Sequence, residues 1–239
     1  MSTTTERDGK TKVLCLHGFA QDGTTFRAKI GAIRKQLKSA CEFYFLDAPH
    51  DVAGAFDADG AEMRELGASN DASGSFAWFT SGENARAGAK RASDDGWTRP
   101  ALSREYDGLD ETREKIRAFA LEHGPFGGVI GFSQGATIAL AALAVIEELR
   151  GSARWAVLVA GFEPLDTVLK SAAREATPIA IKTLHVHGEN DKLVTRERMM
   201  ALAEHFEESQ REFWFHEGAH GVPSTALAKH MKAWLQVQR

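Results

Sequence analysis

Short apolar runs alternate along the chain with segments whose apolar residues recur every three or four positions. The runs predict six strands, at residues 12–17, 43–46, 127–131, 154–160, 183–187 and 212–216. The periodic segments predict helices at residues 25–37, 109–122, 134–149, 195–206 and 223–236. Strands that alternate with helices predict an α/β fold, with a mostly parallel sheet of about six strands and helices on both faces.

Residues 50 to about 105 break this alternation. The segment is rich in Asp, Gly, Ser and Ala and shows no sustained period. It also contains aromatic residues, among them Trp78 and Phe79, which a plain solvated linker would not hold. We therefore expect a single domain over residues 1–239, with an irregular insertion at about 50–105 that forms a wall or lid over a pocket.

Composition narrows the class of protein. The 239 residues carry 29 Lys and Arg against 33 Asp and Glu, a net charge of -4, which does not favour a nucleic-acid partner. The longest largely apolar run, residues 135–146, is shorter than the ~18 residues of a membrane span. The polar N-terminal segment has no signal-peptide pattern, so we expect a cytoplasmic protein. Cys15 and Cys41 lie in apolar stretches and are expected to be buried, reduced thiols.

The strongest chemical signal is the pentapeptide Gly-Phe-Ser-Gln-Gly at residues 131–135. It stands between a predicted strand and a predicted helix, the context of a nucleophile elbow, in which a sharp turn presents the Ser133 hydroxyl. The alternative is a glycine-rich turn in which Ser133 only caps the helix. The flanking strand and helix favour the elbow, so Ser133 is the candidate nucleophile.

A serine nucleophile needs a base and a carboxylate that orients the base. His220 lies in the loop between the last predicted strand and helix, and His216, on the strand end, is its nearest rival. Asp191 follows the strand at 183–187, with Glu189 as the alternative. The order Ser133, Asp191, His220 along the chain is the order that this type of site shows, and each residue follows a separate predicted strand.

Two further sets of residues complete the predicted site. The backbone N–H groups of Gln134 and Phe19 are the expected oxyanion donors, because one follows the nucleophile and the other lies in the loop after the first strand. Trp78, Phe79, Leu193 and Val194 are candidates for an apolar acyl pocket. His185 and His187 share one face of a strand, but no acidic or cysteine ligands accompany them at a metal spacing, so we expect no metal and no organic cofactor.

With these residues assembled, the chain resembles the FSH family of serine hydrolases, small α/β-hydrolases of eukaryotes. The likeness rests on four blocks: residues 13–19 with 33–37, the Asp-Ala-Pro at 47–49, the Phe-Ala-Trp-Phe at 76–79, and residues 124–136. The loops of Asp191 and His220 extend it toward the C-terminus. The Gly-Phe-Ser-Gln-Gly-Ala string also occurs in acyl-protein thioesterases and related carboxylesterases.

The resemblance implies an α/β-hydrolase fold and an esterase with Ser133 as nucleophile, His220 as base and Asp191 as its orienting carboxylate. The expected substrate is a small-molecule acyl ester, and the aromatic residues suggest an unbranched acyl chain of medium to long length. Two alternatives stay open: a thioesterase that acts on acyl-CoA or a carrier, because the same residues attack either carbonyl, and a hydrolase-fold module that binds a ligand without turnover.

Overall fold

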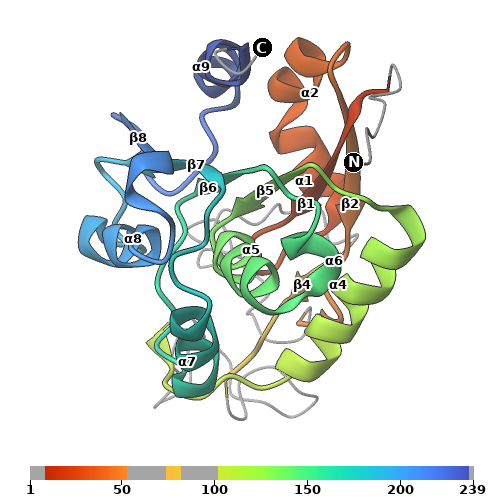
Figure 1. Ribbon diagram of the computed structural model, residues 1–239. Helices are drawn as coiled ribbons and strands as arrows, with labels where there is room; N and C mark the ends of the chain where they lie inside the picture. Colours follow the sequence, from red (N-terminus) through yellow and green to blue (C-terminus); the bar gives the residue numbers. More distant parts are fainter. Residues whose placement is uncertain (1–8, 53–73, 82–101, 237–239) are drawn as a thin grey trace.

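The computed structural model describes residues 9–52, 74–81 and 102–236 (Figure 1). Its main sheet is built from β1 (Thr11–Leu16), β2 (Cys41–Leu46), β5 (Gly128–Phe132), β6 (Trp155–Val159), β7 (Lys182–Gly188) and β8 (Arg211–His216). The helices are α1 (Gly23–Lys29), α2 (Gly31–Leu37), α4 (Leu109–His123), α5 (Gln134–Val145), α6 (Glu147–Arg150), α7 (Thr167–Glu175), α8 (Arg196–Ala203) and α9 (Ser224–Gln236), with a 3₁₀ turn, η3 (Glu208–Gln210).

The six strands lie in the order β2-β1-β5-β6-β7-β8, and every neighbouring pair is parallel. The prediction of an α/β fold with a parallel sheet of about six strands is confirmed. The chain first adds β2 on one side of β1 and later places β5 on the other side. This reversal makes the carboxyl ends of β1 and β5 the topological switch point, where open α/β sheets form their binding crevice.

Helices cover both faces of the sheet, and alternate strand residues point to the two layers. In β1, Val13 and Cys15 pack with α1, α2 and α9, whereas Leu14 and Leu16 face the layer of α4, α5, α7 and α8. Helix α5 runs through the middle of the second layer (Figure 1), and its residues from Gln134 to Ala144 are all buried. Such a fully buried helix holds the residue that precedes it in a rigid position.

The main differences from the sequence prediction lie in the helices. The helix expected at 25–37 is two helices, because the backbone leaves helical geometry at Ile30, just before Gly31, a weak helix former. The helix expected at 134–149 ends at Val145 and is followed by the short α6. Helix α7 was not predicted, because only Leu169 and Ala173 of this short segment are buried.

The expected insertion at 50–105 falls largely outside the described residues. Within its described part, β3 (His50–Asp51) and β4 (Phe76–Ala77) pair antiparallel in a small second sheet. The prediction of one domain with a lid-like insertion stays a prediction. No helix in the described part of the chain has the length and apolar character needed to span a bilayer.

Candidate active site

Ser133 stands on the sharp turn between β5 and α5. Its backbone angles are φ 52° and ψ -119°, a conformation that non-glycine residues rarely adopt. The backbone N–H of Ser133 donates to the carbonyl of Val159 at 2.8 Å, which ties the turn to β6. The side chain stays partly exposed at the carboxyl edge of the sheet. The turn therefore presents the hydroxyl to a ligand while the backbone is fixed.

The two glycines of the pentapeptide are required by close backbone approach. A Cβ atom on Gly131 would lie 2.6 Å from the Cα of Ala136, and one on Gly135 would lie 2.3 Å from the carbonyl oxygens of Leu16 and His17. No side chain fits at either distance. The start of α5 thus lies directly against the end of β1, which brings the Ser133 turn next to the loop that contains Phe19.

The structure brings Ser133, His220 and Asp191 together from three loops. His220 Nε2 lies 2.9 Å from Ser133 Oγ, and His220 Nδ1 lies 2.8 Å from Asp191 Oδ2. The two side chains that back the serine are shielded from water, with exposed fractions of 5% for His220 and 0% for Asp191. The ring of Phe132 packs 5.1 Å from the imidazole of His220. This is a continuous hydrogen-bonded line from a hydroxyl to a buried carboxylate.

The Asp191 carboxylate is stabilised in its ionised form. Burial alone would raise its pKa, but the hydrogen bond and charge of His220 and the backbone N–H groups of Val194 and Leu193 lower it below the usual value. Those two N–H groups donate to Oδ1 at 2.9 Å and 2.8 Å, so Oδ2 is left for the imidazole. Glu189, the alternative acid, is exposed, and its backbone N–H bonds to the carbonyl of His216 instead.

The loops that carry the acid and the histidine are paired with each other. A Cβ atom on Gly188 would lie 2.4 Å from the carbonyl oxygen of Gly218 and 2.5 Å from that of Ala219. Asn190 adds a hydrogen bond from its backbone N–H to the Gly218 carbonyl at 3.1 Å and one from its side chain to the Glu217 carbonyl at 2.6 Å. The distance between Asp191 and His220 is therefore set by backbone contact between the two loops.

The two expected oxyanion donors lie just beyond the ends of two neighbouring strands. Phe19 follows β1 and Gln134 follows Ser133 after β5, and these strands pair directly. Gln134 is the first residue of α5, so no carbonyl oxygen of an earlier helical turn is there to accept its backbone N–H. This N–H also lies at the positive end of the helix dipole. Ala20, one residue after Phe19, adopts a positive φ of 54°, which turns the loop back over the sheet edge.

The four residues expected to line an acyl pocket lie in different environments. Trp78 and Phe79 are fully buried in the core beside α4 and α5, and Phe79 stacks on Tyr106 with ring centres 3.9 Å apart. Val194 is also buried, whereas Leu193 is partly exposed beside Asp191. Direct contact of Trp78 and Phe79 with a substrate stays a prediction, for which this conformation offers no open surface.

The histidine pair considered as a metal site is buried on β7. His185 Nε2 lies 3.0 Å from Thr183 Oγ1, and burial lowers the pKa of this histidine to about 3. His187 is buried near Asp191, and burial lowers its pKa as well. Among the residues that the structure describes, no group of three or more His, Cys, Asp or Glu is placed to hold a metal ion. Cys15 and Cys41 are buried, free thiols, and burial raises the pKa of Cys41 to about 11.

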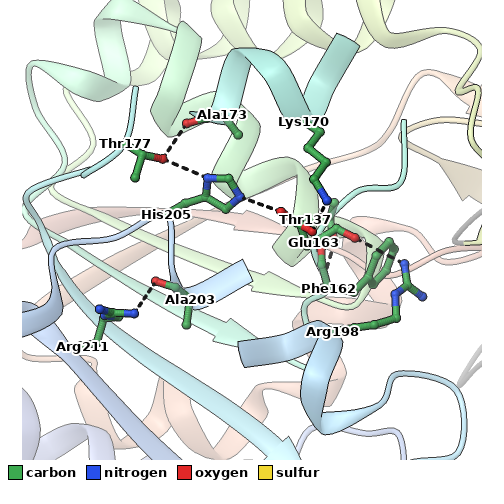
Figure 2. Close-up of polar contacts among 10 residues, drawn as sticks. All are labelled: Thr137, Phe162, Glu163, Lys170, Ala173, Thr177, Arg198, Ala203, His205 and Arg211. Atoms are coloured by element: carbon green, nitrogen blue, oxygen red, sulfur yellow. Dashed lines mark hydrogen bonds and ion pairs between the residues drawn. The ribbon is translucent and has the colours of Figure 1, made fainter. Parts of the chain in front are cut away.

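Sequence reasoning missed the polar cluster that holds the loop after β6 (Figure 2). The Glu163 carboxylate contacts both Lys170 and His205, and His205 Nδ1 lies 2.9 Å from Thr177 Oγ1. Thr137, one turn into α5, donates to the carbonyl of Phe162 at 2.8 Å. The cluster joins α5, α7 and the segment that follows α8 to the loop after β6. Most of its contacts join residues 25 to 42 positions apart along the chain, so no local pattern could reveal it.

Comparison with known proteins places the chain in a family. The model of the family described as serine hydrolase (FSH1) matches residues 5–232. Esterase OVCA2 of Danio rerio is 32% identical over 221 residues, which cover 90% of this chain and 91% of that protein. Family of serine hydrolases 3 of Saccharomyces cerevisiae is 31% identical over 242 residues, which cover 95% and 84%. The Bacillus cereus carboxylesterase structure shares the fold, with a TM-score of 0.61 at 14% identity over 97% of this chain and 90% of that one.

Proposed function

The chain belongs to the serine hydrolase (FSH1) family, and from this premise we propose that it hydrolyses carboxylic esters of small acyl substrates through an acyl-enzyme intermediate on Ser133. The observation that carries the proposal is the hydrogen-bonded line from Ser133 Oγ through His220 to Asp191, with distances of 2.9 Å and 2.8 Å. The esterases among the relatives support the same reaction class.

In the acylation step, Ser133 Oγ attacks the ester carbonyl carbon while its proton passes to His220 Nε2. Asp191 Oδ2 accepts the hydrogen bond from Nδ1–H, which keeps Nε2 free of a proton before attack and stabilises the imidazolium after it. The lowered pKa of Asp191 keeps the carboxylate ionised during this transfer. His220 then returns the proton to the leaving alkoxide, and a water molecule repeats the sequence on the acyl-enzyme.

The negative charge of the tetrahedral intermediate requires fixed hydrogen-bond donors. We assign this role to the backbone N–H groups of Gln134 and Phe19, from the two strands at the switch point of the sheet. Loss of one such donor typically lowers turnover by ~10²–10³-fold. Leu193, partly exposed and bonded through its backbone N–H to Asp191, is the residue of the proposed apolar acyl pocket that we expect to contact substrate beside the triad.

Two measurements test this proposal. A fluorophosphonate probe should label the wild-type protein and fail to label Ser133→Ala, because only an activated serine reacts. A panel of p-nitrophenyl esters from acetyl to palmitoyl should show a preference for medium or long chains. A wild type that neither reacts with the probe nor cleaves any ester would overturn the catalytic proposal and favour the ligand-binding alternative. A flat or acetyl-biased profile would overturn the apolar pocket alone.

A further inference from the structure

One buried residue, Trp78, is hydrogen-bonded to both elements that carry the proposed oxyanion donors. The indole N–H of Trp78 donates to the carbonyl of His17 at 2.8 Å, two residues before Phe19. The backbone N–H of Trp78 donates to Gln134 Oε1, also at 2.8 Å. The segment that contains Trp78 therefore bridges the loop after β1 and the first residue of α5.

The side chain of Gln134 makes a second bond to the same segment. Its Nε2 donates to the carbonyl of Phe79 at 2.8 Å, so the amide pairs with a backbone N–H and a backbone carbonyl as a strand neighbour would. Because a peptide N–H only donates and a carbonyl only accepts, this pairing fixes the orientation of the amide. The hydroxyl of Thr112 on α4 donates to the Trp78 carbonyl, which anchors the bridging segment to a third element.

The loop that precedes Phe19 is held by the imidazole of His17. Its Nε2 accepts the backbone N–H of Ala48 at 2.9 Å, and its Nδ1 donates to the carbonyl of Gly18 at 2.8 Å. These two partners require the neutral ring with the proton on Nδ1. Burial lowers the pKa of His17 to about 4, which keeps the ring neutral in mildly acidic solution. The ring also packs on Trp78, with ring centres 5.1 Å apart.

None of these side chains has surface to offer a substrate. Trp78 and His17 are 0% exposed and Gln134 is 3% exposed. Hydrogen bonds in such a dry environment are strong, and a group left without its partner is costly. We propose that Trp78 and the side chain of Gln134 are positioning residues that set the spacing between the two backbone donors of the oxyanion hole. This inference rests on the proposed function and assigns Trp78 a role behind the site rather than in the acyl pocket.

Three variants test the inference. Trp78→Phe removes the indole N–H and keeps the backbone bond to Gln134. Gln134→Met removes both amide bonds and keeps the backbone N–H that would hold the oxyanion. Trp234→Phe is the matched control, because it makes the same change at a buried tryptophan whose Nε1 has no hydrogen-bond partner among the described residues. Each variant is assayed below its melting temperature, with active sites counted by the fluorophosphonate probe.

We expect kcat to fall about 10- to 100-fold in Trp78→Phe and in Gln134→Met, because small displacements of catalytic groups cost this much. KM should stay within about twofold, since no substrate contact is lost. The affinity for a trifluoromethyl ketone, which forms a tetrahedral oxyanion on the serine, should fall by the same factor as kcat. Trp234→Phe should keep kcat and inhibitor affinity near the wild-type values.

Several results would overturn the inference. A folded Trp78→Phe or Gln134→Met with wild-type kcat removes its basis, and if one variant fails to fold the other decides. A rise in KM with unchanged kcat would instead place Trp78 in contact with the acyl chain. Equal losses in Trp78→Phe and Trp234→Phe would reduce the effect to general core damage. A wild type without esterase activity would remove the proposed function together with this inference, whereas an active wild type with unimpaired variants removes the inference alone.

Discussion

Gly188→Ala should separate the two loops that carry the acid and the histidine. A Cβ atom at residue 188 would lie 2.4 Å from the Gly218 carbonyl oxygen, and side-chain Cβ atoms essentially never come closer than 3.0 Å to another heavy atom. The loops must therefore move apart by about 0.6 Å or more, because both contacts are backbone and cannot rotate away. Asp191 and His220 lie two or three residues from this contact, and their 2.8 Å hydrogen bond would be stretched or misaligned.

We expect kcat of Gly188→Ala to fall by about 10²-fold, the usual cost of a displacement approaching 1 Å in a catalytic group. The assay is p-nitrophenyl ester hydrolysis, with the rate of fluorophosphonate labelling as a second measure of serine activation and melting temperature as the test of folding. Gly221→Ala is the control: it lies next to His220, but its Cβ would have no neighbour within 4 Å. A folded Gly188→Ala with wild-type kcat, or a Gly221→Ala that is equally impaired, would refute this reasoning.

Three further predictions use other parts of the structure. Asp191→Asn should lower kcat by ~10³–10⁴-fold with little change in KM, because an amide can hold the imidazole in the wrong tautomer; steady-state kinetics check this. Glu163→Gln should lower the free energy of unfolding by about 1–3 kcal/mol, since Lys170 and His205 lose a charged acceptor, and kcat should change little. Urea unfolding measures the loss, and an unchanged midpoint would contradict the prediction. The pKa of His185 falls from 6.5 to about 3 on folding, so between these values the unfolded chain binds a proton that the folded chain does not. The free energy of unfolding should therefore be unaffected by this group above about pH 6.5 and should fall as the pH drops toward 3, by about 3 kcal/mol at pH 4. Replacing both partners of its hydrogen bond in Thr183→Val/His185→Phe should make the decline of stability between pH 6.5 and 4 shallower in urea unfolding, and an unaltered slope would argue against this source of acid sensitivity.

The sheet could be predicted from local pattern because most of its strands contain a short run of apolar residues, and in β7 the histidines alternate with the buried Leu184 and Val186. Strand β6, for example, is buried at every position, as expected of a strand covered on both faces. Short helices were harder. Helix α7 buries only Leu169 and Ala173, and its N-cap Asp166 also accepts a hydrogen bond from the backbone N–H of Tyr106, a contact that the linear order does not contain.

The meeting of Ser133, Asp191 and His220 at one site could be predicted because each follows a strand, and parallel strands bring their carboxyl ends to one edge. The hydrogen bonds that hold the loops around these residues could not be predicted. Gln134 was chosen for its backbone N–H, but its side-chain bonds to Trp78 and Phe79 join segments more than 50 residues apart. His17 was interpreted as the end of a strand, and its contact with Ala48 depends on the pairing of β1 with β2.

The switch point of the sheet explains why the two loops need these additional contacts. The proposed oxyanion donors come from β1 and β5, which are adjacent in the sheet but more than 100 residues apart in the chain. Hydrogen bonds between the strands fix their register but end at Leu16 and Gly131, before either donor is reached. Beyond that point, spacing depends on the close contact of Gly135 with the Leu16 and His17 carbonyls and on the bonds made by Trp78. The close packing at Gly135 and the hydrogen-bonded bridge through Trp78 are therefore two separate restraints on the spacing of the two loops, so a loss of either one should misplace the donors even when the other is intact.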